Sequence, residues 1–451
     1  MTTISSPGIG SGLDVNSIIS QLVAIERQPI DVLKAKSTKI QAQISEYGKL
    51  KSAISAFRDA ALKLTSNDTW GMTTGSSSDS TAVGVTVKSG AAVGGYSLQV
   101  TALAKAQSNA SGLFASSAAL PGAGTLTLTR GATAVDITVE ATDTLTGVRD
   151  KINAANAGVT AIVFTDASGS RLLMRSTATG LANAFTVSGG PPLLYTPENP
   201  ATMNQAAADA AATLNGLPIT SPSNTLANVV DGVTLTLSKV TTGPVEISVV
   251  QDNESLKKAV QAFADAYNAL NTLIATEVKY DAANKTGGPL QGDSTAVGLQ
   301  RQMRALLGSS SGASSVFARL SDVGLETQSN GSLSVSAGKL DTALANLPEL
   351  KKLFANSDAL VPANDGIARQ FRTMGDSLLS VDGAITTRTD GLRRRIELNQ
   401  DAQERLDLRV AQIEKRLRAQ YTALDATLGR MSGLSSYVTQ QMAMFTNSSK
   451  A

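Results

Sequence analysis

The sequence contains no cysteine and no histidine, and its 451 residues include one tryptophan and only 4% aromatic residues in all. Without these side chains there is no zinc site of the ordinary kind, no thiol nucleophile and no imidazole general base. Disulfide bonds are excluded too, but a protein held together by its size and by assembly needs none, so the cellular compartment stays open. We therefore expect no catalytic residues, no bound metal and no cofactor.

The chain also lacks a strong charge of either sign. Lys and Arg number 39 against 37 for Asp and Glu, which gives a net charge of +2 and no long-range field that would gather nucleic acid. The first eight residues lack the basic and apolar regions of a cleaved signal peptide, and no stretch approaches the roughly 20 apolar residues of a membrane span. We expect neither a nucleic-acid partner nor a membrane span, and export, if it occurs, by another route.

Apolar spacing predicts a helical start for the chain. From Asp14, a suitable N-cap residue, the first helix carries one apolar stripe, and Pro29 is expected to kink or break it. That stripe consists of Val15, Ile18, Ile19, Leu22 and Ile25. A second helix should follow directly and end near Asn67. Its apolar positions, spaced by threes and fours, are Leu33, Ile40, Ile44, Tyr47, Ile54, Phe57, Ala61 and Leu64.

In the middle of the chain, residues 76–252 alternate between apolar and polar side chains, as strands with one solvent-facing side do. One helix interrupts them, capped by Asp143 or Thr144, with its apolar face at Leu145, Val148 and Ile152. Residues 189–212, rich in Pro and Ala, are interpreted as a linker between two small β-rich domains. Helical spacing then returns, and Asn330–Gly331 predicts a hairpin with a tight turn.

The last helix has the four-three spacing of a coiled coil, with one extra four-residue step from Leu417 to Tyr421 that should locally relax the supercoil. Its stripe runs through Leu392, Ile396, Asn399, Gln403, Leu406, Val410, Ile413, Leu417, Tyr421, Leu424, Leu428, Met431, Ser435, Val438, Met442 and Phe445. Such a stripe cannot be buried by one helix alone and requires a partner helix. Asn399 and Gln403 are polar residues in the seam, where they reduce stability but fix register and partner number.

The charges beside this stripe permit two interpretations. Arg409 could reach Glu414 of a parallel neighbouring copy. Alternatively, the charges form a solvated face with pairs inside one helix, such as Asp401 with Arg405 and Glu414 with Arg418. We favour the second interpretation, because exposed pairs contribute only about 0.3–0.5 kcal/mol each.

Together these patterns predict an α+β multidomain protein, with a long helical coiled-coil stem built from both termini and two inserted β-rich domains. The expected segments are a flexible start and stem helix (1–40), the first part of a helical stem domain (41–75), an inner β-rich domain (76–107 and 201–252), an outer β-rich domain inserted into it (108–200), the second part of the stem domain with a hairpin (253–390), and the coiled-coil helix (391–451). The residues expected to form the self-assembly and stem interface are Ile18, Leu22, Ile25, Ile40, Ile44, Leu392, Ile396, Leu406, Val410, Ile413, Leu417, Tyr421, Leu424 and Leu428.

Several motifs resemble the flagellar hook-associated protein 2 family, the cap of the bacterial flagellar filament. The first stretch is Pro7 to Val15, which reads PGIGSGLDV, followed by Leu22–Val23, Glu26 and Pro29. Further matches, in the family's order, are Gly95–Val100 with Leu103–Gln107, Leu214–Gly216 with Asp231–Leu237, Gly292–Ser294, Leu320–Leu325 with Gly331–Leu333, Gly383–Ile385 with Arg388–Leu392, Tyr421–Asp425 and Ser435–Val438. Residues 110–200 match only loosely.

The resemblance implies a protein that is exported unfolded through the flagellar type III apparatus and acts outside the cell at the distal tip of the filament. It also implies a ring of about five or six copies, with a closed point symmetry. The partners it implies are the chain itself, flagellin, the hook-filament junction proteins and an export chaperone. The implied action is to retain arriving flagellin, give it a protected space to fold, and open one insertion site at a time.

Three other functions are alternatives to capping. A glycosidase would need two positioned carboxyl groups, and the middle region offers Asp136, Glu140, Asp143, Asp150 and Asp166, but few aromatic side chains to hold a sugar. Another axial subunit, flagellin or a hook-filament junction protein, would share helical ends but give open filaments rather than a closed ring. A surface adhesin that binds mucin or glycans through the β-rich domains could coexist with capping.

Overall fold

The computed structural model describes residues 14–190 and 203–448 of the chain. The predicted flexible start and the first motif of the family resemblance therefore lie largely outside the described residues. The chain divides into two compact units, one made of Ser66–Lys258 and the other of the residues up to Thr65 and from Ala259 onward. No helix among the described residues is long and apolar enough to cross a membrane.

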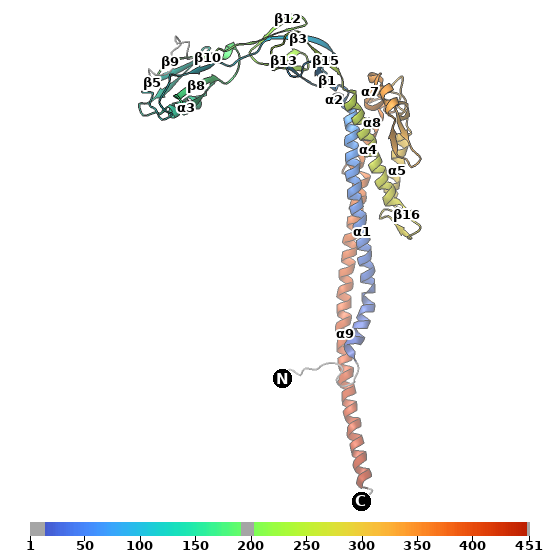
Figure 1. Cartoon of the computed structure of the whole chain (residues 1–451). Coiled ribbons are helices and arrows are strands. Elements are labelled where there is room, and N and C mark those ends of the chain that lie inside the picture. The colour runs from blue at the N-terminus through green and yellow to red at the C-terminus, as the bar shows by residue number, and fades with distance from the viewer. Residues whose placement is uncertain (1–13, 191–202, 449–451) are drawn as a thin grey trace. The chain divides into compact units, whose positions relative to one another are not determined.

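The helical unit is built around the two longest helices, α1 (Val15–Thr65) and α9 (Ala384–Ser448) (Figure 1). Around the C-terminal half of α1 pack α4 (Asn253–Val278), α5 (Ser294–Leu307), α6 (Ala337–Leu344), α7 (Leu347–Ala355) and α8 (Ile367–Leu379). Two small hairpins belong to the same unit, β16 (Tyr280–Asp281) with β17 (Thr286–Gly287), and β18 (Leu325–Thr327) with β19 (Leu333–Val335).

Four aromatic side chains form the centre of this helical unit. Phe57 of α1, Phe263 and Tyr267 of α4, and Phe371 of α8 are completely buried, and their ring centroids lie 5.1–6.3 Å apart. Most of these pairs meet edge to face, the arrangement in which the positive edge of one ring contacts the negative face of another. Three helices far apart in the sequence are thereby joined at one point.

The other unit begins with the short helix α2 (Asn67–Trp70) and contains two β-rich layers with separate cores. One core lies between a five-stranded sheet and a three-stranded sheet. In order across the sheets, the strands are β1 (Thr73–Ser77), β15 (Val245–Gln251), β3 (Gly94–Ala102), β11 (Ala210–Leu214) and β12 (Leu217–Ser221), then β13 (Thr225–Val230), β14 (Val233–Leu237) and β2 (Val83–Val87).

The second core combines two sheets with the helix α3 (Leu145–Ala154). Its strands are β10 (Met203–Gln205), β4 (Ser108–Ala110), β8 (Gly169–Ser176) and β7 (Val159–Asp166), then β6 (Thr133–Val139), β5 (Gly124–Arg130) and β9 (Phe185–Gly189). The helix predicted here is confirmed: Leu145, Val148 and Ile152 are buried, and the Thr144 hydroxyl accepts a hydrogen bond from the Gly147 amide at 3.2 Å.

The linker predicted at residues 189–212 is wrong for its described C-terminal part. β10 pairs with β4, and β11 pairs with both β3 and β12. Residues 203–205 thus belong with the outer sheet, and the chain returns to the inner sheet after Gln205 rather than at residue 201. Ala210 and Ala212 are buried and alternate with half-buried neighbours, because the short side chain of alanine fits a crowded sheet face despite its low strand propensity.

Two other local predictions, the hairpin turn at Asn330–Gly331 and the interruption of the first helix at Pro29, differ in part from the structure. The hairpin at Asn330–Gly331 exists, but five residues separate its strands and only Gly331 has a positive φ, of 80°. α1 is continuous through Pro29, so the break that the sequence allowed there does not occur, while the kink stays a prediction. Pro29 is exposed, while Val23 and Ile30 on either side are buried against α9, so packing holds the helix together where the proline removes a hydrogen bond.

Replacing Pro29 by alanine should raise the free energy of unfolding of the helical unit by up to about 3 kcal/mol, because it restores an amide donor and removes the ring's clash with the preceding turn. Urea titration and hydrogen exchange of the amides at residues 26–33 would measure this. The matched control is Ala35→Pro, two turns further along the exposed side of α1, which should cost a similar amount. Equal or lower stability of the Pro29→Ala protein would contradict the explanation.

Candidate functional site

α1 and α9 lie side by side in antiparallel orientation, and we call this pair the stem (Figure 1). Near the start of α1, Val410 of α9 packs into a small apolar cluster with four residues of α1, which are Val15, Ile19, Val23 and Ile30. Leu406, Leu417 and Tyr421 of α9 pack against the same cluster and are half-buried. The partner helix that the α9 stripe requires is therefore supplied, over this length, by the chain's own first helix.

The face of α1 that meets α9 differs from the predicted one at its first turns. Leu22 and Ile25 are 36% and 60% exposed, and Ile18 is only half-buried. These three lie on the face next to the seam. Both stripes are apolar and each fits a helical period, so the sequence alone cannot tell which of them meets α9.

The other predicted interface residues are distributed along the stem. Ile40, Leu392 and Val410 are buried, and Leu424 is 46% exposed. Seven are half-buried, namely Ile44, Ile396, Leu406, Ile413, Leu417, Tyr421 and Leu428. Any contact of these residues with another copy of the chain stays a prediction.

Polar residues interrupt the seam at one level. The Asn399 side-chain amide donates hydrogen bonds to the Leu33 carbonyl at 2.8 Å and to the Ser37 hydroxyl at 2.6 Å, and Gln403 donates to the same hydroxyl at 3.3 Å. Asn399 is 8% exposed, so these bonds form away from bulk water. Only one axial position of α9 on α1 satisfies them, which makes this the level that sets the register.

Substituting Asn399 and Gln403 together by leucine should leave stability unchanged or raise it by at most about 1 kcal/mol, while the register becomes less well defined. Because the chain has no cysteine, spin labels on cysteines introduced at the exposed positions Lys34 and Asp401 report the distance between the helices directly. The expected result is a broader distance distribution in the double variant. An unchanged distribution would show that the apolar seam alone fixes the register.

Of the two intrahelical ion pairs predicted for α9, one is present. Arg418 contacts Glu414 at 2.8 Å, whereas no ion pair joins Asp401 to Arg405 in the part of the chain that the structure describes. A contact of Arg409 with Glu414 of a neighbouring copy stays a prediction.

Beyond Tyr421 the stripe of α9 has no α1 to cover it (Figure 1). We call residues 424–444 the overhang. Its large apolar side chains are mostly exposed, and examples are Leu424, Met431, Leu434, Tyr437 and Val438, at 46–67%. The side chain of Phe445, the last residue of the predicted stripe, lies outside the described residues. An uncovered apolar stripe of this length requires a partner that residues 14–190 and 203–448 do not supply.

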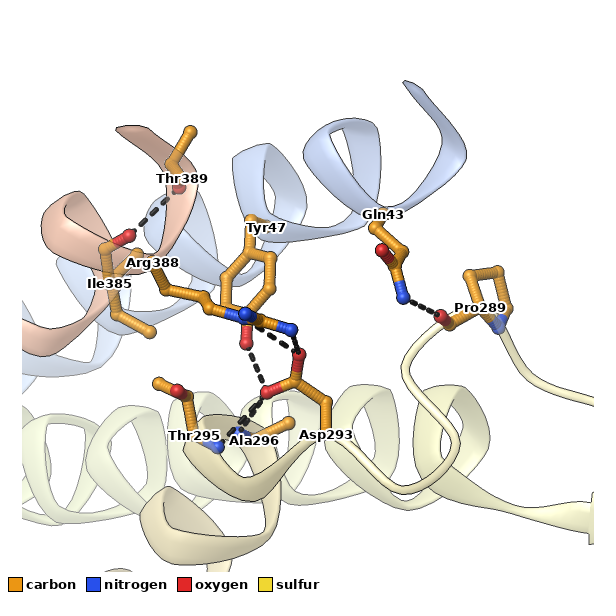
Figure 2. A network of polar contacts seen from close by, with 9 residues as sticks. All are labelled: Gln43, Tyr47, Pro289, Asp293, Thr295, Ala296, Ile385, Arg388 and Thr389. Carbon is orange, nitrogen blue, oxygen red and sulfur yellow. Dashed lines mark hydrogen bonds and ion pairs between the residues drawn. The ribbon is translucent and has the colours of Figure 1, made fainter. Parts of the chain in front are cut away.

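A buried polar network joins α1, the start of α5 and α9 (Figure 2). Asp293, 5% exposed, caps α5 by accepting from the amides of Thr295 and Ala296 at 2.9 and 3.3 Å. One of its oxygens also accepts the Tyr47 hydroxyl at 2.6 Å, and the other accepts two nitrogens of the Arg388 guanidinium at 3.0 and 2.7 Å.

The network has clear electrostatic consequences. Burial alone would raise the pKa of Asp293, but the hydrogen bonds from Tyr47 and Arg388 outweigh it and lower that pKa below its usual value. Burial, with the Asp293 carboxylate beside it, raises the pKa of Tyr47 well above its usual value. One turn along α1, Gln43 donates to the Pro289 carbonyl at 3.2 Å, so the loop before α5 is tied to α1 twice.

Sequence reasoning did not find this network. Helical spacing places Tyr47 in an apolar stripe, and Asp293 and Arg388 occur only within motifs of the family resemblance. The one local signal was Asp293 directly before a helical run, since aspartate is a favoured N-cap. Nothing in a single sequence indicates that residues 246 and 95 positions apart meet there.

Three of the five carboxylates considered for catalysis have local side-chain partners in the β-rich unit. Asp143 contacts Lys151 at 2.6 Å, Asp136 accepts the Thr127 hydroxyl at 2.6 Å, and Asp150 contacts its neighbour Arg149 at 2.7 Å. These contacts stabilise a helix start and strand pairs.

Comparison with known sequences adds a decisive observation. The chain matches the family description "Flagellar hook-associated protein 2 N-terminus" over residues 11–107 and "Flagellar hook-associated protein 2 C-terminus" over residues 207–433. It is 33% identical to flagellar hook-associated protein 2 of Escherichia coli K12 over 479 aligned residues, which cover 99% of this chain and 100% of the relative. The chain belongs to the flagellar hook-associated protein 2 family.

Another relative and a solved structure support this family assignment. A-type flagellar hook-associated protein 2 of Pseudomonas aeruginosa is 31% identical, with 98% of this chain and 97% of the relative covered. The crystal structure of the D1-D2-D3 domains of the Escherichia coli flagellar cap protein FliD superimposes with a TM-score of 0.64 at 30% identity, over 77% of this chain and 99% of that one. Residues 125–178, where the family resemblance was loose, match "Flagellin hook IN motif".

Proposed function

We propose that this chain caps the distal end of a bacterial flagellar filament, retains the flagellin subunits that arrive there, and promotes their folding and addition. The observation that carries the proposal is the similarity to flagellar hook-associated protein 2, which covers 99% of the chain and includes family matches at residues 11–107 and 207–433. The chain acts outside the cell, exported by the flagellar apparatus. Its action is structural rather than catalytic.

The overhang supports a role in assembly. Its exposed apolar stripe continues the seam that α1 covers higher up, so the same kind of helical partner fits it. We infer that the overhangs of about five or six copies pack together or against the filament end, as a closed ring of identical subunits requires. Flagellin, the hook-filament junction proteins and an export chaperone are the further partners we propose.

Deleting the gene in its source organism tests the proposal. We expect filaments to be missing and unpolymerised flagellin to accumulate in the medium, with the intact gene restoring both. Normal filaments without leaked flagellin would refute capping and favour a junction subunit, and open filaments formed by the purified chain alone would favour a flagellin.

Complementation with overhang variants sharpens the test. Met431→Glu with Val438→Glu places two charges on the exposed stripe without touching the α1 seam, and we expect it to leak flagellin like the deletion. The matched control, Ala426→Glu with Gln440→Glu, places the same charges on the opposite side of the helix and should restore filaments. Restoration by both variants would show that the stripe has no part in assembly.

A further inference from the structure

One side of the stem contains a groove between α1 and α9 with a volume of about 570 Å³. α1 contributes Leu33, Lys36, Lys39, Ile40 and Gln43, and α9 contributes Arg395, Leu398, Asn399 and Ala402. Leu398 is 67% exposed, and both lysines and Arg395 are exposed as well. The groove is therefore apolar at its centre and basic at its edges.

The same face continues along the stem toward the start of α1. On α1 the three-four spacing of Lys36 and Lys39 extends back through Val32, Ile25 and Leu22, which are 36–60% exposed. On α9 the spacing of Arg395, Leu398 and Ala402 extends through Arg405, Arg409, Gln412 and Arg416, all exposed. We call this whole strip the basic groove; from Leu22 to Gln43 it is about 30 Å long at 1.5 Å per residue.

The basic groove carries six cations with no carboxylate partner. Within residues 14–190 and 203–448, no ion pair involves Lys36, Lys39, Arg395, Arg405, Arg409 or Arg416. On α1, Glu46 follows Gln43 at the same spacing, but it is only 9% exposed and its carboxylate pairs with Lys49 at 2.9 Å. Six unpaired cations around exposed leucine, isoleucine and valine side chains are unusual on a chain whose net charge is only +2.

The opposite side of the stem differs. Its hollow, of about 550 Å³, is lined by Ile396 and by small or polar side chains such as Ser37 and Thr38, without a charged residue. Its charges are mixed in nearly equal number, with Asp31, Glu404, Asp407 and Glu414 against Arg27, Lys34 and Arg418. A second copy of the chain therefore has no strongly acidic stem face to offer the basic groove.

We propose that the basic groove docks an amphipathic helix of another protein, one whose apolar stripe is flanked by carboxylates. Helix-in-groove recognition combines an apolar face at three-four spacing with charges at its edges, and the groove presents the complement of both. The exposed leucine, isoleucine and valine side chains favour a peptide over a polyanion such as a glycan, which would use the cations alone. This interaction is separate from capping and from the overhang.

The probe is a fluorescent 21-residue helical peptide with leucines at three-four spacing and glutamates beside them, titrated against the full-length chain by anisotropy. Its twin carries lysine in place of every glutamate. We expect the glutamate peptide to bind at least about tenfold more tightly than the lysine peptide, and to weaken as salt is raised. Lys36→Glu, Arg395→Glu and Arg409→Glu combined should weaken it about tenfold or more, and so should Leu398→Ser.

The control variant combines Arg27→Glu, Lys34→Glu and Lys415→Glu, which makes the same charge change away from the groove and should leave binding unchanged. Equal binding or absence of binding for the two peptides overturns the proposal, as does full binding by the groove variant. Displacement of the peptide by heparin with no effect of Leu398→Ser would assign the surface to a polyanion. If the groove variant loses self-association of the full chain, the occupant is a second copy and the proposal is wrong, while capping stands.

Discussion

Replacing Asp293 by alanine is expected to lower the free energy of unfolding of the helical unit by about 3 kcal/mol, because it leaves the buried Tyr47 phenol and the Arg388 guanidinium, which is 34% exposed, without their common acceptor. The same carboxylate caps α5, and loss of a cap alone costs about 1 kcal/mol. Chemical denaturation followed by far-ultraviolet circular dichroism measures the change.

Two substitutions separate the contributions to that loss. Tyr47→Phe removes one hydrogen bond and should cost about 1 kcal/mol. Asp376→Ala removes a half-exposed carboxylate that lies 3.6 Å from Arg372, and should change stability by less than about 1 kcal/mol. A loss for Asp293→Ala no larger than that for Asp376→Ala would show that the network does not hold the three segments together.

The network also predicts how stability depends on pH. Because the folded pKa of Asp293 is lowered, its contribution is present above the unfolded value of 3.8 and is lost as the pH falls through the folded pKa. We expect the difference in stability between the native chain and Asp293→Asn to shrink as the pH is lowered below 3.8. A constant difference over that range would mean that the carboxylate is not held by the two donors.

Replacing Phe371 by alanine should cost about 3–5 kcal/mol, the other large effect expected, because the ring is fully buried and meets three aromatic partners. The cavity would open where α1, α4 and α8 converge, so the helical unit as a whole should unfold at lower denaturant. Phe164→Ala in the β-rich unit is the control, since that ring is 52% exposed and its removal should change stability by about 0.5 kcal/mol or less. Similar losses for the two variants would contradict the central place of the cluster.

Periodicity predicted the elements that have one strong apolar stripe. The α9 seam from Leu392 to Tyr421 and the capped helix at Leu145 follow from spacing, because only one face of each helix is apolar. The stem face of α1 could not be predicted, because Val15, Ile19 and Val23 compete with Ile18, Leu22 and Ile25 as equally apolar stripes. The strand at Ala210–Leu214 was not predicted, because its three consecutive alanines carry little strand signal and its two neighbouring strands decide its conformation.

The two polar sites differ in how far the sequence predicts them. Asn399 and Gln403 stood out because they interrupt a heptad, and they do form the register level. Asp293, Tyr47 and Arg388 interrupt no pattern, and their meeting depends on how three helices pack. A local pattern reveals a residue that is unusual within its own element, but not one whose importance lies in contacts between elements.

The hydrogen bond from Asn399 to the Leu33 carbonyl spans 366 positions of the sequence. The seam residues of α1 cannot be covered until α9 is available, which requires nearly 400 residues of the chain. The strands of the β-rich unit, by contrast, pair with one another within residues 73–251. Contacts of such long sequence separation form late, because the loop that they close costs entropy first. A chain that ends before α9 therefore leaves the apolar face of α1 exposed to solvent. Only a chain that includes α9 can form the stem and present the overhang and the basic groove.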